Sequence, residues 1–112
     1  MSETAKPRIT MISPDTLKSW IEEDSAVLID VREPPEFEGA RIAGAAHNPL
    51  SNFDPAAVPI PEDKHVVLYC ASGMRCGMAS EMLQLSGYKG DLHRLEGGIS
   101  AWYHAGNPIE QG

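Results

Sequence analysis

The apolar residues of this 112-residue chain gather in short runs that are separated by turn-forming residues. Residues 26–31 are apolar except for Asp30, and residues 65–69 form a second run of similar length. Runs without alternation are typical of strands that are buried on both faces, as in a parallel sheet. Residues 9–12 and 91–95 are further strand candidates, and a brief extended piece is expected near residue 45. The pattern therefore predicts strands spread over the whole chain.

Helical signals lie between these runs. Ser13 is expected to cap a helix that starts at Pro14, because a serine followed by proline and an acidic residue is a typical helix start. Further helices are predicted to begin at Pro34, at Cys76 and at Ile99, and Ser86–Gly87 should end the third. Strands that alternate with helices predict an α/β fold, with a parallel sheet covered by helices on both faces.

The spacing of apolar residues also predicts which side of each helix is buried. In the first helix, Leu17, Trp20 and Ile21 fall at helical spacing and are expected to face the core. In the helix that follows residue 75, Met78, Met82 and Leu85 lie on one side with Ala79 and Leu83 beside them, and we expect the methionines to be core residues.

Length and charge limit the possible functions. The chain is long enough for one domain, which we place at residues 9–112 after a flexible lead at residues 1–8. The net charge is −7 and no basic run is present, so nucleic acid and anionic membranes are not expected partners. No apolar run approaches the roughly 18 residues of a membrane span. The polar N-terminus lacks a signal-peptide core, which predicts a cytoplasmic protein.

The cysteines and histidines do not form a pattern typical of a disulfide framework or a metal site. The two cysteines lie six positions apart, and a disulfide-stapled domain usually has more. His47, His65, His93 and His104 are scattered, without the spacing of zinc ligands. We therefore expect no metal and no organic cofactor.

Cys70 is the candidate nucleophile. It follows the run at residues 65–69 and opens a loop that closes with Arg75, just before a predicted helix. Backbone N–H groups and the helix dipole favour negative charge at such a place, so the thiol should ionise more readily than a free one. The alternative is a buried cysteine that only ends a core strand.

Two reactions suit a cysteine in a loop of inward-pointing N–H groups. A phosphatase would attack phosphorus and bind three phosphate oxygens, whereas a sulfurtransferase would attack a sulfane sulfur and hold a persulfide. Four residues separate Cys70 from Arg75, one fewer than in the phosphatase signature, and the smaller loop favours sulfur transfer. The loop also holds no general acid for an alkoxide, whereas sulfite leaves without a proton. A small cysteine phosphatase or arsenate reductase stays an alternative, as does a non-enzymatic module that binds a partner.

Three segments carry a family resemblance, in the expected order. They are residues 28–37 with 41–45, the loop at residues 70–75, and residues 95–102 with 105–108. Through them the chain resembles the single-domain rhodaneses, the thiosulfate sulfurtransferase family, over about residues 9–109.

The resemblance implies a rhodanese-like fold with a five-stranded parallel sheet and helices on both faces. It implies that Cys70 becomes a persulfide, stabilised by the backbone N–H groups of the loop, and that Arg75 serves either loop geometry or anion binding. Asp30 and Arg32 would support the site, Arg32 through a structural ion pair, and Trp102 would anchor the core. The loop residues are Ala71, Ser72, Gly73, Met74 and Arg75. The expected partners are a small anionic sulfur donor and, as acceptor, a thiol, cyanide or a protein.

Several positions depart from the family pattern. Arg41 and Ala43 stand where the family often has histidine and proline, but both lie away from the loop. Ala71 and Met74 are uncharged, although many thiosulfate-using members have a basic residue at the first of these positions. Fewer cations would weaken the binding of dianionic thiosulfate, which leaves the donor open.

Cys76 directly follows the loop, at the expected start of a helix. One interpretation is a small buried residue in a tight helix start, because free cysteine often behaves as a small hydrophobe. The other is a resolving thiol that attacks a persulfide or sulfenate on Cys70. The second interpretation requires that the two side chains lie close together.

Overall fold

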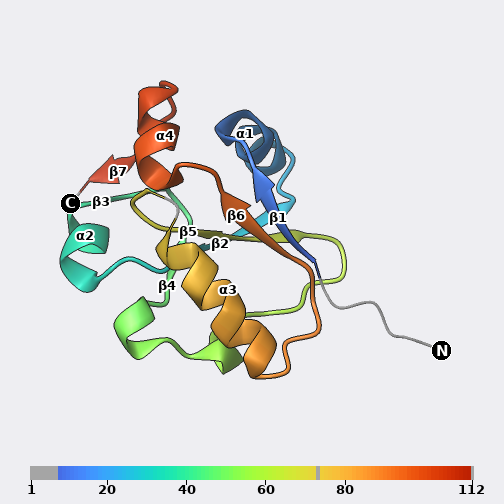
Figure 1. Ribbon diagram of the computed structural model, residues 1–112. Coiled ribbons are helices and arrows are strands. Elements are labelled where there is room, and N and C mark those ends of the chain that lie inside the picture. The colour runs from blue at the N-terminus through green and yellow to red at the C-terminus, as the bar shows by residue number, and fades with distance from the viewer. Residues whose placement is uncertain (1–7, 73, 112) are drawn as a thin grey trace.

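A five-stranded parallel sheet forms the centre of the molecule (Figure 1). The computed structural model describes residues 8–72 and 74–111. The strand order is β1-β6-β5-β2-β4, and all neighbouring strands run parallel. This confirms the predicted α/β fold and places β5, which leads to Cys70, in the middle of the sheet. The strands are β1 (Ile9–Ile12), β2 (Ala26–Asp30), β4 (Ala46–His47), β5 (His65–Tyr69) and β6 (Leu92–Leu95).

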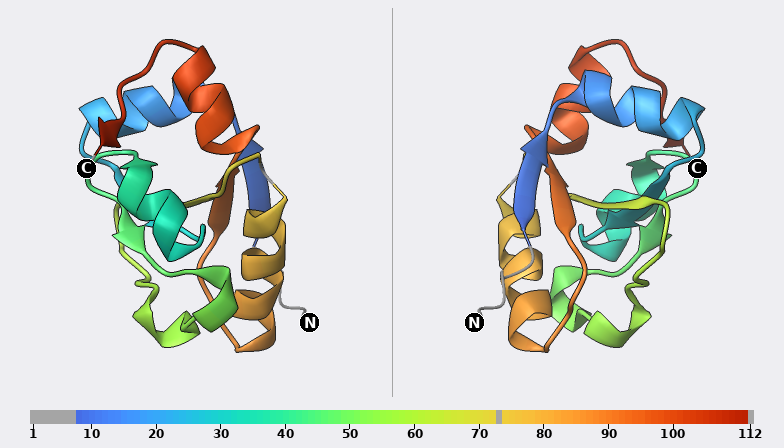
Figure 2. Two further views of the ribbon diagram at one scale, coloured as in Figure 1. Left: turned by 90° about the vertical axis from the view of Figure 1, so that its left-hand side faces the viewer. Right: turned by 90° about the vertical axis from the view of Figure 1, so that its right-hand side faces the viewer.

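Helices cover both faces of this sheet, as predicted (Figure 2). On one face lie α1 (Pro14–Glu22) and α4 (Gly98–His104), and on the other lies α3 (Arg75–Leu85) together with the short 3-10 helices η1 (Leu50–Asn52) and η2 (Pro55–Ala57). The helix α2 (Pro34–Gly39) follows β2. Ser13 caps α1, since its hydroxyl accepts a hydrogen bond from the N–H of Thr16 at 3.2 Å.

Each face of the sheet has its own hydrophobic core. Under α1 and α4, the fully buried Leu17 and Trp102 pack with side chains from β5 and β6. Trp102 is thus a core anchor, and its indole N–H donates a hydrogen bond to the carbonyl oxygen of Pro108 at 2.7 Å. Under α3, Ala79 and Leu83 pack with both cysteines and with the other face of the strands. Cys70 therefore belongs to a well-packed core and lies on the α3 side.

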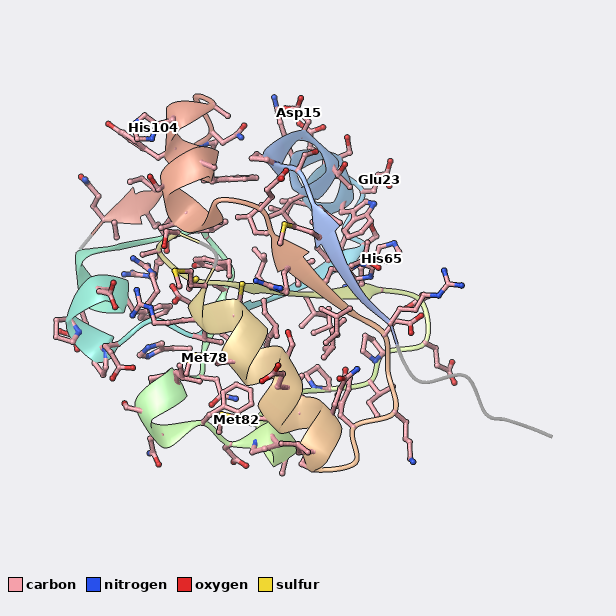
Figure 3. The ribbon with its side chains drawn as sticks, viewed as in Figure 1. Asp15, Glu23, His65, Met78, Met82 and His104 are labelled. Carbon is pink, nitrogen blue, oxygen red and sulfur yellow. The ribbon has the colours of Figure 1, made fainter. Side chains whose placement is uncertain are left out.

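The prediction that the methionines of α3 face the core is wrong. Met78 and Leu85 are exposed, at 56% and 88% of their surface, and Met82 is exposed too. Figure 3 shows Met78 and Met82 one turn apart along α3. The buried residues are instead Cys76, Ala79, Ser80 and Leu83. Apolar residues occur on every side of this helix, so their spacing does not predict which side is buried. The side with the smaller residues Ala79 and Ser80 can approach the sheet more closely.

Other differences are local. Ile21 of α1 was expected in the core but is exposed, while Leu17 is buried and Trp20 is half-buried. A second small sheet pairs β3 (Ala40–Arg41) with β7 (Glu110–Gln111) in antiparallel fashion, which the sequence pattern did not indicate. The predicted flexible lead at residues 1–8 lies outside the described residues except for Arg8, whose backbone N–H donates to Asp91 Oδ1 at 2.9 Å and whose carbonyl oxygen accepts from the N–H of Leu92 at 2.8 Å. Gly73 of the predicted loop also lies outside the described residues.

Candidate active site

Cys70 lies at the carboxyl end of the central strand β5, between the sheet and the first turn of α3. Only 1% of the residue is exposed. Ligands bind at the carboxyl ends of the strands in open parallel sheets, so the position matches a candidate active site. Around it, Ala71 and Arg75 are half-buried, whereas Ser72 and Met74 are exposed. The described part of the loop therefore covers the cysteine and presents its outer residues to solvent.

The N-terminal end of α4 holds the loop from one side (Figure 1). The N–H of Ile99 donates a hydrogen bond to the carbonyl oxygen of Cys70 at 2.8 Å, and that of Ser100 to the carbonyl oxygen of Ala71 at 3.1 Å. Gly98 makes this approach possible. Its φ is +64°, and a Cβ there would lie 2.4 Å from the carbonyl oxygen of Cys70. Gly98 of the C-terminal motif thus allows α4 to pack directly against the loop.

Arg75 ties the end of the loop to α2. Its guanidinium donates hydrogen bonds to both carboxylate oxygens of Glu36, at 2.6 Å and 2.8 Å. The bonds from Arg75 hold the pKa of Glu36 down at about 2, despite partial burial. The same pair raises the pKa of Arg75, and the charge of Cys70 acts in that direction too. Two roles were expected for Arg75, shaping the loop or binding an anion. Its pairing with Glu36 supports the first.

Glu36 in turn belongs to the start of α2. Its carboxylate accepts a hydrogen bond from the N–H of Glu33 at 3.0 Å, and the Glu33 carboxylate accepts one from the hydroxyl of Ser51. A chain of contacts thus runs from the loop through α2 to η1. No role was predicted for Glu36 from the sequence. The available signal was its place in the first turn of a helix, inside the first family motif.

Asp30 and Arg32 form a buried ion pair at the end of β2. Arg32 Nη2 lies 2.9 Å from Asp30 Oδ2, and the backbone N–H of Arg32 donates to Asp30 Oδ1 at 2.8 Å. Burial disfavours the charge of Arg32, but the hydrogen bonds and charge of Asp30 outweigh it and raise the arginine pKa. Arg32 also donates to the carbonyl oxygen of Ala40. The ion pair expected for Arg32 is present, and it fixes the chain between β2 and β3.

Cys76 is fully buried in the first turn of α3 and is in hydrogen-bond contact with Cys70. That contact, followed by burial, raises the pKa of the Cys76 thiol, while a second contact with Arg94 acts in the opposite direction. Neither Cys70 nor Cys76 takes part in a disulfide bond. The proximity that a resolving thiol requires is therefore met. Arg94, which lies beside His93 in the four-residue strand β6, was not singled out in the sequence.

Two further results bear on the kind of site. The described residues contain no group of three or more histidine, cysteine or acidic side chains arranged to hold a metal ion. Within the same residues, no helix is long and apolar enough to cross a membrane.

Comparison with known proteins places the chain in a family. The model of the rhodanese-like domain matches residues 13–105. This chain belongs to the rhodanese-like domain family. The described geometry agrees with this assignment, because the three motifs of the rhodanese-like chain meet at one end of its sheet. The predicted resemblance is thereby confirmed.

Relatives of this rhodanese-like chain differ in how much is known of them. It is 43% identical over 108 residues to the uncharacterized protein slr1261 of Synechocystis, covering 96% of this chain and 59% of that protein. It is 37% identical over 86 residues to a sulfurtransferase of Allochromatium vinosum, and the match covers 77% of this chain and 79% of that protein. The chain thus spans less than two thirds of the length of slr1261.

Among solved structures, the rhodanese-like chain is similar to the thiosulfate sulfurtransferase of Pseudomonas aeruginosa. The TM-score is 0.77 at 29% identity, covering 99% of this chain and 21% of that one. The likeness therefore concerns one domain of a much longer protein.

Proposed function

We propose that this chain is a sulfurtransferase that works through a persulfide on Cys70. The observation that carries the proposal is the placement of Cys70: it ends the central strand, contacts the first turn of α3, and lies in a loop held by α4 and by the Arg75–Glu36 pair. A thiol beside a helix N-terminus is in an environment that stabilises negative charge. The sulfurtransferase names of two similar proteins support the same chemistry.

The reaction would proceed in two displacements. The Cys70 thiolate attacks the outer sulfur of thiosulfate, the S–S bond breaks, and sulfite leaves with the electron pair. A thiol, cyanide or a thiol of a partner protein then attacks the outer sulfur of the persulfide, and Cys70 leaves as thiolate. Another persulfide can replace thiosulfate as donor, and the uncharged Ala71 and Met74 leave that choice open. No step requires a metal or an organic cofactor.

The phosphatase and arsenate reductase alternative is less well supported. A phosphatase arginine closes the loop by binding phosphate oxygens with its two-pronged guanidinium. In this chain both prongs of Arg75 are directed to Glu36. A phosphate or arsenate ion would have to displace this carboxylate and approach its negative charge.

The partner-binding alternative has one observation in its favour. The outer side of α3 exposes Met78, Met82 and Leu85 beside the loop residue Met74, which is 78% exposed. Methionines at a surface adapt well to a protein partner. We regard this as support for a protein among the sulfur acceptors, because a purely structural module would not need Cys70.

Intact mass after incubation with thiosulfate tests the proposal. The chain should gain one sulfur atom, and Cys70→Ala should gain none while unfolding like the parent chain. Turnover of thiosulfate and cyanide should be lost in the same variant. Cys70-dependent hydrolysis of an aryl phosphate, without sulfur uptake from thiosulfate or from a persulfide donor, would replace the proposal with the phosphatase alternative.

A further inference from the structure

The candidate site contains a second thiol that the proposed reaction does not use. Cys76 lies in the first turn of α3, fully buried and in hydrogen-bond contact with Cys70. The two cysteines share one packed core, so neither side chain has much freedom to turn away. A purely structural role for Cys76 would not require contact with another thiol. Its contact with Cys70 instead gives it the position required for disulfide exchange.

Arg94 approaches Cys76 from the neighbouring strand β6. Its guanidinium contacts the thiol and favours the charged form of Cys76. The guanidinium also lies against Gly77, where an added Cβ would be 3.0 Å from Nη2 of Arg94. Gly77 thus leaves the space through which the cation reaches the start of α3. A cation beside a thiol favours the thiolate, and here Arg94 acts against the rise in the pKa of Cys76 that contact with Cys70 and burial cause.

We propose that Cys76 is a resolving thiol, which attacks the persulfide on Cys70, releases hydrosulfide and leaves a Cys70–Cys76 disulfide. This inference rests on the proposed function, because it begins with the persulfide. It adds a second fate for the bound sulfur. Where no acceptor collects the sulfur, the chain itself reduces it, and a dithiol reductant then restores both thiols.

The atoms and electrons balance without any other reactant. Cys76 Sγ attacks Cys70 Sγ, the bond from Cys70 Sγ to the outer sulfur breaks, and the electron pair goes to the outer sulfur. The proton of Cys76 leaves with that sulfur as hydrosulfide. The outer sulfur is reduced, and the two cysteine sulfurs together lose two electrons as their bond forms. A dithiol then opens the disulfide by exchange and is itself oxidised to a disulfide.

The experiment compares the chain with Cys76→Ser and Cys76→Ala after loading with thiosulfate and removal of the donor. In the parent chain, intact mass should show the added sulfur disappear and be replaced by the loss of two hydrogen atoms, with one sulfide released per chain. Both variants should gain one sulfur atom and keep it. With a dithiol such as dithiothreitol present, sulfide release from the parent chain should become catalytic in thiosulfate, at a rate at least tenfold above either variant.

Each outcome separates the two proposals. If the parent chain keeps its added sulfur as long as Cys76→Ser does and forms no disulfide, the resolving role is overturned while the proposed function stands. If no form of the chain takes up sulfur from thiosulfate or from a persulfide donor, the proposed function fails. The ability of Cys70 and Cys76 to form a disulfide can then still be measured directly. The thiol oxidant diamide should convert the parent chain to a form with an internal Cys70–Cys76 disulfide. Absence of that disulfide overturns the resolving role independently.

The variant Arg94→Met distinguishes a resolving thiol from a merely structural cysteine. Removal of the cation should slow disulfide formation and shift its pH profile to higher pH, while the final extent of disulfide stays the same. An unchanged pH profile in a folded Arg94→Met chain contradicts the part assigned to Arg94.

Discussion

The guanidinium of Arg75 and the carboxylate of Glu36 meet through two hydrogen bonds, from Nη1 to Oε1 and from Nη2 to Oε2. The two residues lie 39 positions apart in the chain. Paired in this way, Arg75 fixes the last residue of the loop against α2, and its guanidinium is directed to a carboxylate of the chain itself. The loop thereby gains its shape from a second segment of the chain.

If Arg75 acts through loop shape, Glu36→Gln and Arg75→Lys should have similar effects. Each breaks the two-point contact, and each should slow sulfur loading of Cys70 by roughly tenfold, or about 1.4 kcal/mol of activation free energy. The double variant should be little worse than either single one, because both remove the same contact. The rates of sulfur loading are measured by quenching the reaction at a series of times and determining the intact mass of the chain. A lower KM for thiosulfate in Glu36→Gln would instead show that the freed Arg75 binds the donor.

The low pKa of Glu36 predicts a pH-dependent contribution to stability. Its ordinary value of 4.5 falls to about 2 in the folded chain, because Arg75 donates to the charged form. The contribution is therefore fully present above pH 4.5 and is lost as the pH falls towards 2. Denaturant unfolding of the parent chain and of Glu36→Gln should differ above pH 4.5 and converge at lower pH. The difference should stay below about 1 kcal/mol, since the pair is partly exposed. A constant difference across this range would contradict the linkage.

Asp30→Asn should destabilise the chain by about 3–5 kcal/mol, because it leaves the buried Arg32 without its counter-charge. Urea unfolding measures the loss. Asp24→Asn is a matched control: Asp24 pairs with Lys64 at the surface, and its φ of +57° suits asparagine. The control should change stability by less than about 0.5 kcal/mol. An active-site role for Asp30 would appear as lost sulfur loading at unchanged stability.

Gly98→Ala should displace the loop and abolish sulfur loading. The new Cβ would lie 2.6 Å from the carbonyl carbon of Ala71, and neither side of this contact is a flexible side chain. Gly106→Ala is the matched control, since Gly106 has a φ of +87° but nothing within 4 Å of its Cβ position. The control should cost about 1–2 kcal/mol of stability and still load sulfur once folded. Equal loading by both variants would remove the role given to Gly98.

The sequence predicts the strands of the sheet well, but it predicts less well how the helices pack on the sheet. The apolar runs that became β2 and β5 are unambiguous, because strands buried on both faces need apolar residues at almost every position. The buried side of α3 could not be predicted in this way. Apolar residues occur all around this helix, and the choice was made by the close packing of Ala79 and Ser80 against the sheet. The β3–β7 pair joins two-residue strands from distant segments, for which no local pattern exists.

At the site, the position of Cys70 and the presence of the Asp30–Arg32 pair follow from residues that are near in sequence. Glu36 and Arg94 were missed because their contacts with Arg75 and Cys76 are made across the fold. A single charged residue in a strand or a helix start has many possible partners, and only the packing of the elements selects one.

The two hydrogen bonds from α4 to the carbonyl oxygens of Cys70 and Ala71 have a consequence for synthesis of the protein. The donors belong to Ile99 and Ser100, which leave the ribosome some thirty residues after the cysteine itself. A chain interrupted before these residues would expose Cys70 without the support that shapes its loop. The loop around Cys70 therefore takes its shape only once α4 has been made, so a nascent or truncated protein that lacks α4 carries the thiol but not the site.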